Sequence, residues 1–303
     1  PGGCKIGPRP IDQHLKGFNA LGYAWTIGDG NVHLQGGGKK SEDIYFDLVS
    51  VGATVNVMLA AAGAEGTTTI ENAAREPEII DVANFLNKIG VNVRGAGTGT
   101  LRITGTKERG WAGHSIIPDR VEAGTFMVAA TATGGDVVIK DVIPRHLEAV
   151  TAKLRESGVT IVEGDDWIRV QGPPRGNAID VKTFPYPGFP TDLQQPLVSY
   201  LAVCSGTSIV TENIFEGRFR YVDELKKMGA NIKVEGRAAV IEGVEEILGA
   251  TVHPHDLRAS SALVIAGLIA RGETRVSGVE HLRRGYNDFV GKLQGLGADL
   301  ELI

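Results

Sequence analysis

The chain has 303 residues, 42% of them hydrophobic, and a formal net charge of −5 from 31 Lys and Arg against 36 Asp and Glu. Because single cores stop growing at about 250 to 300 residues, this length predicts two domains. A mildly acidic chain without a run of Lys or Arg is unsuited to nucleic acid or an anionic membrane, and we expect neither as a partner. No apolar run reaches the roughly 18 residues that would indicate a membrane span.

The chain begins with the Gly- and Pro-rich stretch "PGGCKIGPRP", which predicts a loop that presents Cys4 and Arg9 to solvent. The other cysteine, Cys204, lies in the apolar run "SYLAVCSG", which is typical of a buried, unreactive thiol. Two cysteines do not form a disulfide framework, so we expect a protein of the reducing cytoplasm.

Along the chain, five segments share one pattern: the end of an amphipathic helix, a glycine, then a β-rich run. They are "FNALGYAW", "LNKIGVNV", "LRESGVTI", "LKKMGANI" and "LQGLGADL". Their glycines follow one another at 68, 68, 71 and 68 residues, at Gly22, Gly90, Gly158, Gly229 and Gly297. The spacing exceeds that of the usual solenoid repeats and predicts a small α/β module used several times.

A second series alternates with the first, and in it an apolar helix is followed by glycine and an alternating strand. Its glycines are Gly66, Gly135, Gly206 and Gly272. Each of these helices has a polar start, at Ser50, Asp119, Asp192 and Asp256. N-capping alone would account for all four residues, while equivalent helices would also direct their positive N-termini toward a common anion.

One arginine precedes each helix of the first series: Arg9, Arg75, Arg145, Arg218 and Arg284. Solvated or salt-bridged side chains are one interpretation of each arginine. Because repeated modules pack alike, the set favours a shared surface that binds a ligand with several phosphates or carboxylates.

Seven motifs together resemble the UDP-N-acetylglucosamine enolpyruvyl transferase family along the whole chain. They are "PGGCKIGPRPIDQH", "SVGATVNVM", "EGTTTIENAAREPEI", "PDRVEAGTF", "FPTDLQ", "DLRASSALV" and "RRGY". The resemblance implies an α/β fold of two inside-out domains built from βαβαββ units, with a boundary between residues 1–116 and 117–303. The related shikimate 3-phosphate enzymes share that fold, but the Cys4 loop and "SVGATV" favour the nucleotide-sugar family.

The reaction implied by the resemblance transfers the enolpyruvyl group of phosphoenolpyruvate to the 3′-hydroxyl of UDP-N-acetylglucosamine and releases phosphate, in peptidoglycan precursor synthesis. Cys4 resembles the family's proton donor and the site of fosfomycin alkylation. Asp192 resembles the residue at the sugar 3′-hydroxyl and is the candidate base, although a helix start would lower the pKa of its carboxyl group. Arg9, Arg258 and Arg284 are similar to arginines that bind phosphoenolpyruvate.

The nucleotide-sugar positions carried over from the family lie at three expected helix starts and one loop. They are Arg9, Pro10, Ile11, Asp12, Gln13, Leu48, Val49, Ser50, Val51, Gly52, Asp192 and Ile214. Backbone amides after Ser50 are a physically sensible seat for a diphosphate.

Other motifs do not point to a cofactor. "GGGKKS" lacks the spacing of a P-loop, "RGAGTGT" predicts a hairpin tip, and the histidines are scattered. We therefore expect no metal and no cofactor.

Members of the resembled family are longer, so we expect a missing N-terminal segment, as a second chain or outside this numbering, to be a partner. Two alternatives remain: a non-catalytic fragment that binds nucleotide sugars, and a structural interaction protein whose arginines are solvated. Nucleotide binding without phosphate release would favour the first alternative, and no nucleotide binding would favour the second.

Overall fold

The computed structural model describes residues 10–37 and 40–303, so Cys4 and Arg9 lie outside the described residues. Backbone contacts divide the described chain into two compact units, residues 10–117 (unit 1) and residues 118–303 (unit 2). Each unit has its own hydrophobic core. Within the described ranges, no helix is both long and apolar enough to cross a membrane.

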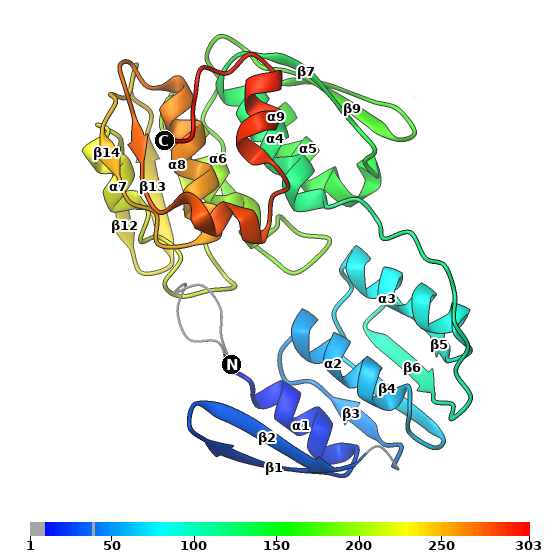
Figure 1. The fold of residues 1–303 in the computed structure, drawn as a ribbon. Helices are drawn as coiled ribbons and strands as arrows, with labels where there is room; N and C mark the ends of the chain where they lie inside the picture. The colour runs from blue at the N-terminus through cyan, green and yellow to red at the C-terminus, as the bar shows by residue number, and fades with distance from the viewer. Residues whose placement is uncertain (1–9, 38–39) are drawn as a thin grey trace. The chain divides into compact units, whose positions relative to one another are not determined.

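Unit 1 contains a β-hairpin and a four-stranded sheet (Figure 1). Its elements are α1 (Asp12–Ala20), β1 (Tyr23–Gly28), β2 (Asn31–Gly36), β3 (Asp43–Tyr45), α2 (Val51–Ala61), β4 (Thr67–Glu71), α3 (Pro77–Lys88), β5 (Asn92–Arg94) and β6 (Thr100–Thr104). Strands β1 and β2 pair only with each other among the described residues, and the larger sheet has the order β3-β4-β6-β5. The predicted hairpin tip "RGAGTGT" connects β5 to β6, as expected.

Unit 2 contains sheets of three, four and two strands, with the orders β7-β9-β8, β10-β11-β13-β12 and β14-β15. Its helices are α4 (Arg120–Ala132), α5 (Glu148–Glu156), α6 (Gln194–Leu201), α7 (Val222–Lys227), α8 (Leu257–Ile269) and α9 (Phe289–Gly295), with 3₁₀ turns η1 (Pro144–Leu147), η2 (Thr191–Leu193) and η3 (Val279–Arg284). Its strands are β7 (Asp136–Lys140), β8 (Thr160–Glu163), β9 (Trp167–Gln171), β10 (Val181–Lys182), β11 (Thr207–Thr211), β12 (Asn231–Glu235), β13 (Ala238–Glu242), β14 (Thr251–Val252) and β15 (Arg275–Val276).

The predicted repeat is confirmed by the two four-stranded sheets, which share one topology. In each sheet the first two strands are parallel and the remaining pairs are antiparallel. The elements follow one another as β3-α2-β4-α3-β5-β6 in unit 1 and β10-α6-β11-α7-β12-β13 in unit 2. Both runs are βαβαββ modules. The runs α1-β1-β2, α4-β7-α5-β8-β9 and β14-α8-β15-α9 each follow part of the same order.

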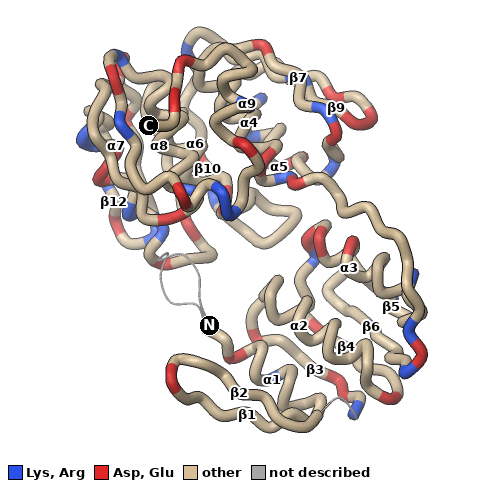
Figure 2. The backbone as a smooth tube through the Cα atoms, viewed as in Figure 1, with Lys and Arg blue, Asp and Glu red and all other residues tan. Residues whose placement is uncertain are grey.

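The helices of unit 2 lie inside and the sheets outside, as the inside-out fold requires. All eight residues of α6 are buried, and α6 contacts both α4 and α8. The strands of the four-stranded sheet alternate: Ile232 and Ile241 are buried against the helices, whereas their neighbours Asn231 and Glu242 are exposed. In Figure 2, α6 carries no charged residue, in agreement with its position in the core.

The helix-stop glycines adopt the conformation that the sequence predicts. Gly90, Gly158, Gly229 and Gly297 have φ between 92° and 101°, a left-handed conformation that residues with a side chain rarely adopt. After α3, the N–H of Gly90 donates to Asn87 and the N–H of Val91 donates to Leu86, the hydrogen-bond pattern of a Schellman motif. In the second series, Gly134 rather than the predicted Gly135 has the positive φ.

A third series of glycines was not identified from the sequence. They come directly after β6, β9 and β13, at Gly105, Gly172 and Gly243. A Cβ on Gly243 would lie 1.6 Å from the carbonyl oxygen of Cys204, and one on Gly172 would lie 2.6 Å from that of Thr131. These glycines therefore allow the end of the sheet to approach the end of a core helix.

Candidate active site

In unit 1, the predicted nucleotide positions lie at two neighbouring helix starts. Pro10 to Gln13 begin α1, and Leu48 to Gly52 lead into α2, which contacts α1. The buried Gln13 side chain joins them, because its Oε1 accepts from the N–H of Asp47 at 3.0 Å. The structure therefore brings the two predicted segments together, and the Gln13 side chain links them by a hydrogen bond.

The start of α2 provides donors for an anion. Ser50 is the N-cap, since its Oγ accepts from the N–H of Ala53 at 3.2 Å, and the first turn of α2 contains no acidic side chain. His14 lies beside Gly52, where an added Cβ would be 3.1 Å from the His14 ring. Burial lowers the pKa of His14, although nearby Asp12 opposes this shift, so His14 is neutral at pH 7.

In unit 2, Asp192 lies between two guanidinium groups. Arg218 Nη2 donates to Oδ1 at 2.6 Å, and Arg258 Nη2 donates to Oδ2 at 3.3 Å. The Asp192 side chain is 38% exposed, whereas those of Arg218 and Arg258 are 2% and 12% exposed. The carboxylate of Asp192 is thus partly exposed to solvent, and the two positively charged side chains that hold it are buried.

Aromatic rings and a hydroxyl hold the two arginines in place. Arg218 lies over the ring of Phe215 at 5.1 Å, and its Nη1 donates to Thr191 Oγ1 at 3.0 Å. Arg258 lies over the ring of Tyr286 at 5.2 Å. Arg218 Nε and Arg258 Nη1 are buried without a hydrogen-bond partner in the described part of the chain. Both cations therefore retain unused donor capacity at this site.

The pKa of Asp192 results from opposed effects. Burial raises it, but the charges of Arg218 and Arg258 and their hydrogen bonds outweigh burial and leave the pKa below its usual value. The carboxyl group is therefore ionised at neutral pH. The sequence predicts this lowering from a helix start, whereas in the structure the two guanidinium groups lower the pKa of Asp192.

The capping interpretation is confirmed at three helix starts and wrong at the fourth. Asp119 accepts from the N–H groups of Val121 and Glu122, and Asp256 accepts from those of Arg258 and Ala259. Ser50 caps α2 as described above.

Asp192 differs from these residues because it lies within η2, immediately before α6, and makes no capping hydrogen bond. Its side chain instead contacts the two arginines, so N-capping does not explain why an aspartate is present at this position.

Two further predicted residues lie on segments near this group. Gly285, which follows Arg284, is close to Arg258: an added Cβ there would be 3.5 Å from Arg258 Nη1. Arg284 itself is exposed at the end of η3. Ile214 is half-buried and begins the loop that leads to Arg218.

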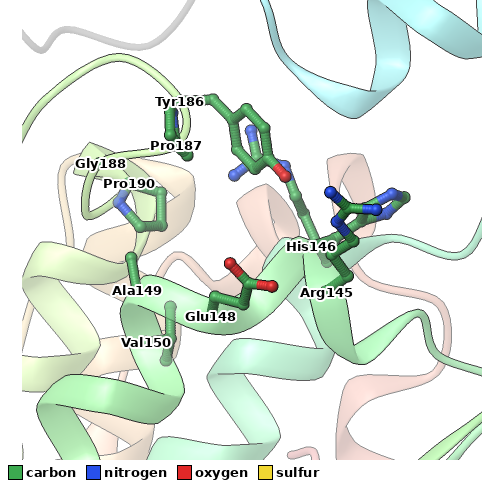
Figure 3. A pocket seen from close by; sticks show the side chains of 10 residues that line it. Arg145, His146, Glu148, Ala149, Val150, Tyr186, Pro187, Gly188 and Pro190 are labelled. Carbon is green, nitrogen blue, oxygen red and sulfur yellow. The ribbon is translucent and has the colours of Figure 1, made fainter. Parts of the chain in front are cut away.

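The repeat arginines do not all occupy one place. Arg145 lines a pocket of unit 2 with His146, Glu148 and Tyr186, where its side chain lies across from the tyrosine ring (Figure 3). Arg218 is the repeat arginine that reaches Asp192. Sequence reasoning included Arg218 only as one of five repeat arginines and did not place it beside Asp192, although its position in the repeat was a signal for a role in the site.

Among the residues that the structure describes, no group of three or more His, Cys, Asp or Glu side chains is arranged to hold a metal ion.

Comparison with solved structures defines the class of fold. The enolpyruvyl transferase NikO from Streptomyces tendae matches with a TM-score of 0.85 and 25% identity, over 97% of this chain and 72% of that one. An EPSP synthase from Acinetobacter baumannii matches with a TM-score of 0.75 and 21% identity, over 98% of this chain and 73% of that one. The family model for EPSP synthase (3-phosphoshikimate 1-carboxyvinyltransferase) matches residues 1–293. The predicted enolpyruvyl transferase fold is thus confirmed.

Sequence relatives define the family. A UDP-N-acetylglucosamine 1-carboxyvinyltransferase from Caldanaerobacter subterraneus is 56% identical over 99% of this chain and 72% of its own length. One from Clostridium botulinum is 55% identical over the same shares. The chain belongs to the UDP-N-acetylglucosamine 1-carboxyvinyltransferase family, whose members are transferases.

Proposed function

We propose that this protein transfers the enolpyruvyl group of phosphoenolpyruvate to the 3′-hydroxyl of UDP-N-acetylglucosamine, with release of phosphate, as a cytoplasmic step of peptidoglycan precursor synthesis. The observation that carries the proposal is the 56% identity to a UDP-N-acetylglucosamine 1-carboxyvinyltransferase over 99% of the chain. The two buried arginines beside Asp192 support it, since both substrates are anions and the two cations outnumber the one carboxylate.

The proposed chemistry is an addition followed by an elimination. The hydroxyl oxygen bonds to C2 of phosphoenolpyruvate while C3 gains a proton, and then the C2–O bond to phosphate breaks as C3 loses a proton. We assign proton donation to Cys4, which lies outside the described residues. We assign to Asp192 the orientation of the hydroxyl and acceptance of its proton; the lowered pKa keeps this carboxylate available but makes it a weak base.

In this proposal, arginine side chains bind the anionic groups of phosphoenolpyruvate. Arg258 has an unused buried donor, Nη1, and Arg284 follows in the segment beside it. With Arg9 they would bind the phosphate and carboxylate of phosphoenolpyruvate and stabilise the charge that develops on them. In unit 1, the N–H groups that follow Ser50 would bind the diphosphate of the nucleotide sugar.

We also propose that an N-terminal segment completes unit 1, because the hairpin β1–β2 has an apolar face. Trp25 lies opposite Leu34 and Ile27 lies opposite Val32, so all four side chains share one face. Trp25, Leu34 and Ile27 are 41%, 39% and 62% exposed. By analogy with β5–β6, the hairpin is the second half of a βαβαββ unit, and two further strands and a helix would complete it.

Phosphate release from the two substrates, measured with and without fosfomycin, tests the function. We expect fosfomycin-sensitive release, and Cys4→Ala should slow it by about 100-fold or more while leaving nucleotide binding nearly unchanged. Binding of UDP-N-acetylglucosamine without phosphate release would favour a non-catalytic nucleotide-sugar protein. If residues 1–303 alone are inactive, co-expression with the N-terminal segment of a relative should restore release; a monodisperse, fully active chain of these residues alone would contradict the need for that segment.

A further inference from the structure

Glu212 is a fully buried carboxylate that none of the assignments above uses. It follows β11 and is 0% exposed. Thr183 Oγ1 and Thr191 Oγ1 donate to it at 2.9 and 2.8 Å, and the N–H groups of Ile214 and Phe215 donate at 2.8 and 3.1 Å. Within the described residues it forms no ion pair, so these four donors satisfy the carboxylate. A buried carboxylate with such complete hydrogen bonding holds its partners in fixed orientations.

One oxygen of Glu212 controls a hydrogen-bond chain to Asp192. The Thr191 hydroxyl has a single proton, which it donates to Glu212 Oε2. Its oxygen lone pairs are thereby left to accept from Arg218 Nη1, at 3.0 Å. Arg218 Nη2 in turn donates to Asp192 Oδ1 at 2.6 Å. The directions in this chain are fixed from both ends, because Arg218 can only donate and Glu212 accepts from Thr191.

The other oxygen of Glu212 binds the loop whose Phe215 ring lies against the same guanidinium group. Oε1 accepts from the N–H groups of Ile214 and Phe215. This places the Phe215 ring 5.1 Å from the guanidinium carbon of Arg218. Ile214 is also a proposed contact of the nucleotide sugar. A single buried side chain therefore joins the nucleotide loop to the arginine that holds Asp192.

We propose that Glu212 is a positioning residue: it orients Arg218 through Thr191 and through the loop at Phe215, and so sets where the Asp192 carboxylate lies for the sugar hydroxyl. Its effect on turnover rests on the proposed function, while its effect on Arg218 does not.

Substitutions can separate this role from a general role in folding. In Glu212→Gln, the amide oxygen can still accept from the loop, but the amide nitrogen must donate to Thr191, whose own proton then loses its acceptor. The loss of a hydrogen-bond partner that orients a metal ligand commonly changes activity by about 10- to 100-fold, and by analogy we expect kcat for phosphate release to fall by about that factor with KM for the nucleotide sugar within about threefold. Thr191→Val, which removes the link at similar volume, should have the same effect, and Thr191→Ser should restore most of kcat.

A double-mutant cycle and a matched control complete the kinetic test. If Glu212 acts through Thr191, then Glu212→Gln should change kcat by less than about twofold in the Thr191→Val background. Glu216→Gln makes the same chemical change on the same loop, at a side chain that is 70% exposed and paired with Arg237, and should leave kcat unchanged. Multiplicative effects in the double variant, or a wild-type kcat in Glu212→Gln, would overturn the proposal.

A second readout needs no turnover. Nitrogen-15 NMR of the arginine side chains should show hindered rotation of the Arg218 guanidinium group in the wild type and in Glu216→Gln. Glu212→Gln and Thr191→Val should both make that rotation faster. Hindered rotation that persists in both variants would refute the positioning role even if phosphate release failed in every variant. A wild-type protein that releases no phosphate but shows these NMR changes would refute the proposed function alone.

Discussion

Replacing Asp192 by Asn tests the central arrangement of unit 2. Asp192 uses both oxygens, at 2.6 Å from Arg218 and 3.3 Å from Arg258. Asparagine has one acceptor oxygen, so one guanidinium group must face an N–H donor. Removing one partner of a fully buried ion pair costs about 3 to 5 kcal/mol. Because the Asp192 side chain is 38% exposed, water screens part of this, and we expect a loss of about 1 to 2 kcal/mol at neutral pH.

Urea unfolding of Asp192→Asn and of the matched variant Asp119→Asn measures this loss. Asp119 is a capping residue of α4, and Asn caps as well as Asp, so its variant should stay within about 0.5 kcal/mol of the wild type. In the phosphate-release assay, Asp192→Asn should be slower by about 100-fold or more. Equal stabilities of Asp192→Asn and the wild type would refute the reasoning about the ion pair.

The difference in stability between the wild type and Asp192→Asn should depend on pH in a defined direction. The pKa of Asp192 is lowered from 3.8, so its pairing stabilises the folded state fully above the unfolded pKa and is lost as pH falls through the folded pKa. The stability gap between wild type and Asp192→Asn should therefore be constant from about pH 5 to pH 8 and narrow below about pH 3.8. A gap that closed between neutral pH and about pH 5 would show that the pKa is raised instead.

Three further predictions concern stability and reactivity. Ser50→Ala removes the cap of α2 and should lower the free energy of unfolding by about 1 kcal/mol in urea titration; no change would mean that water replaces the cap. Gly243→Ala should lower the free energy of unfolding by more than about 2 kcal/mol, because the added Cβ would lie 1.6 Å from a carbonyl oxygen. Gly229→Ala has open space around the added Cβ, and it should lower the same free energy by only about 1 to 2 kcal/mol, because of its positive φ. Burial raises the pKa of Cys204 to about 11, so about 0.1% is thiolate at pH 8, and peptide mapping should find it alkylated only after unfolding; rapid native labelling would contradict its burial.

The sequence determined the features that depend on local backbone chemistry. The helix stops at Gly90, Gly158 and Gly229 could be predicted because only glycine readily adopts the positive φ that a Schellman motif requires. The caps at Ser50 and Asp119 were predictable for the same kind of reason, since a short polar side chain satisfies N–H groups a few residues away. From these spacings the repeated α/β unit followed.

The candidate site was predicted in part. Motif resemblance identified Asp192 and Arg258, but neither the resemblance nor the spacing placed Arg218 beside them. Arg145 holds the corresponding position in the repeat but lines a pocket with His146 and Tyr186, so the repeat alone could not distinguish the two arginines. Glu212 carried no signal, because one acidic residue after a strand looks like any other exposed charge.

The order of the elements, their ends and their repetition can be derived from the sequence, because all three arise from interactions between residues close along the chain. The three-dimensional packing was needed to see that Asp192 is not a cap, that Glu212 is buried, and that Gly243 lies against Cys204. Glu212 and Arg218 lie at the two ends of one loop and meet through Thr191, which is 21 residues before Glu212 and 27 before Arg218. Such contacts depend on how the core helices and sheets pack, and packing places residues together regardless of their separation in sequence.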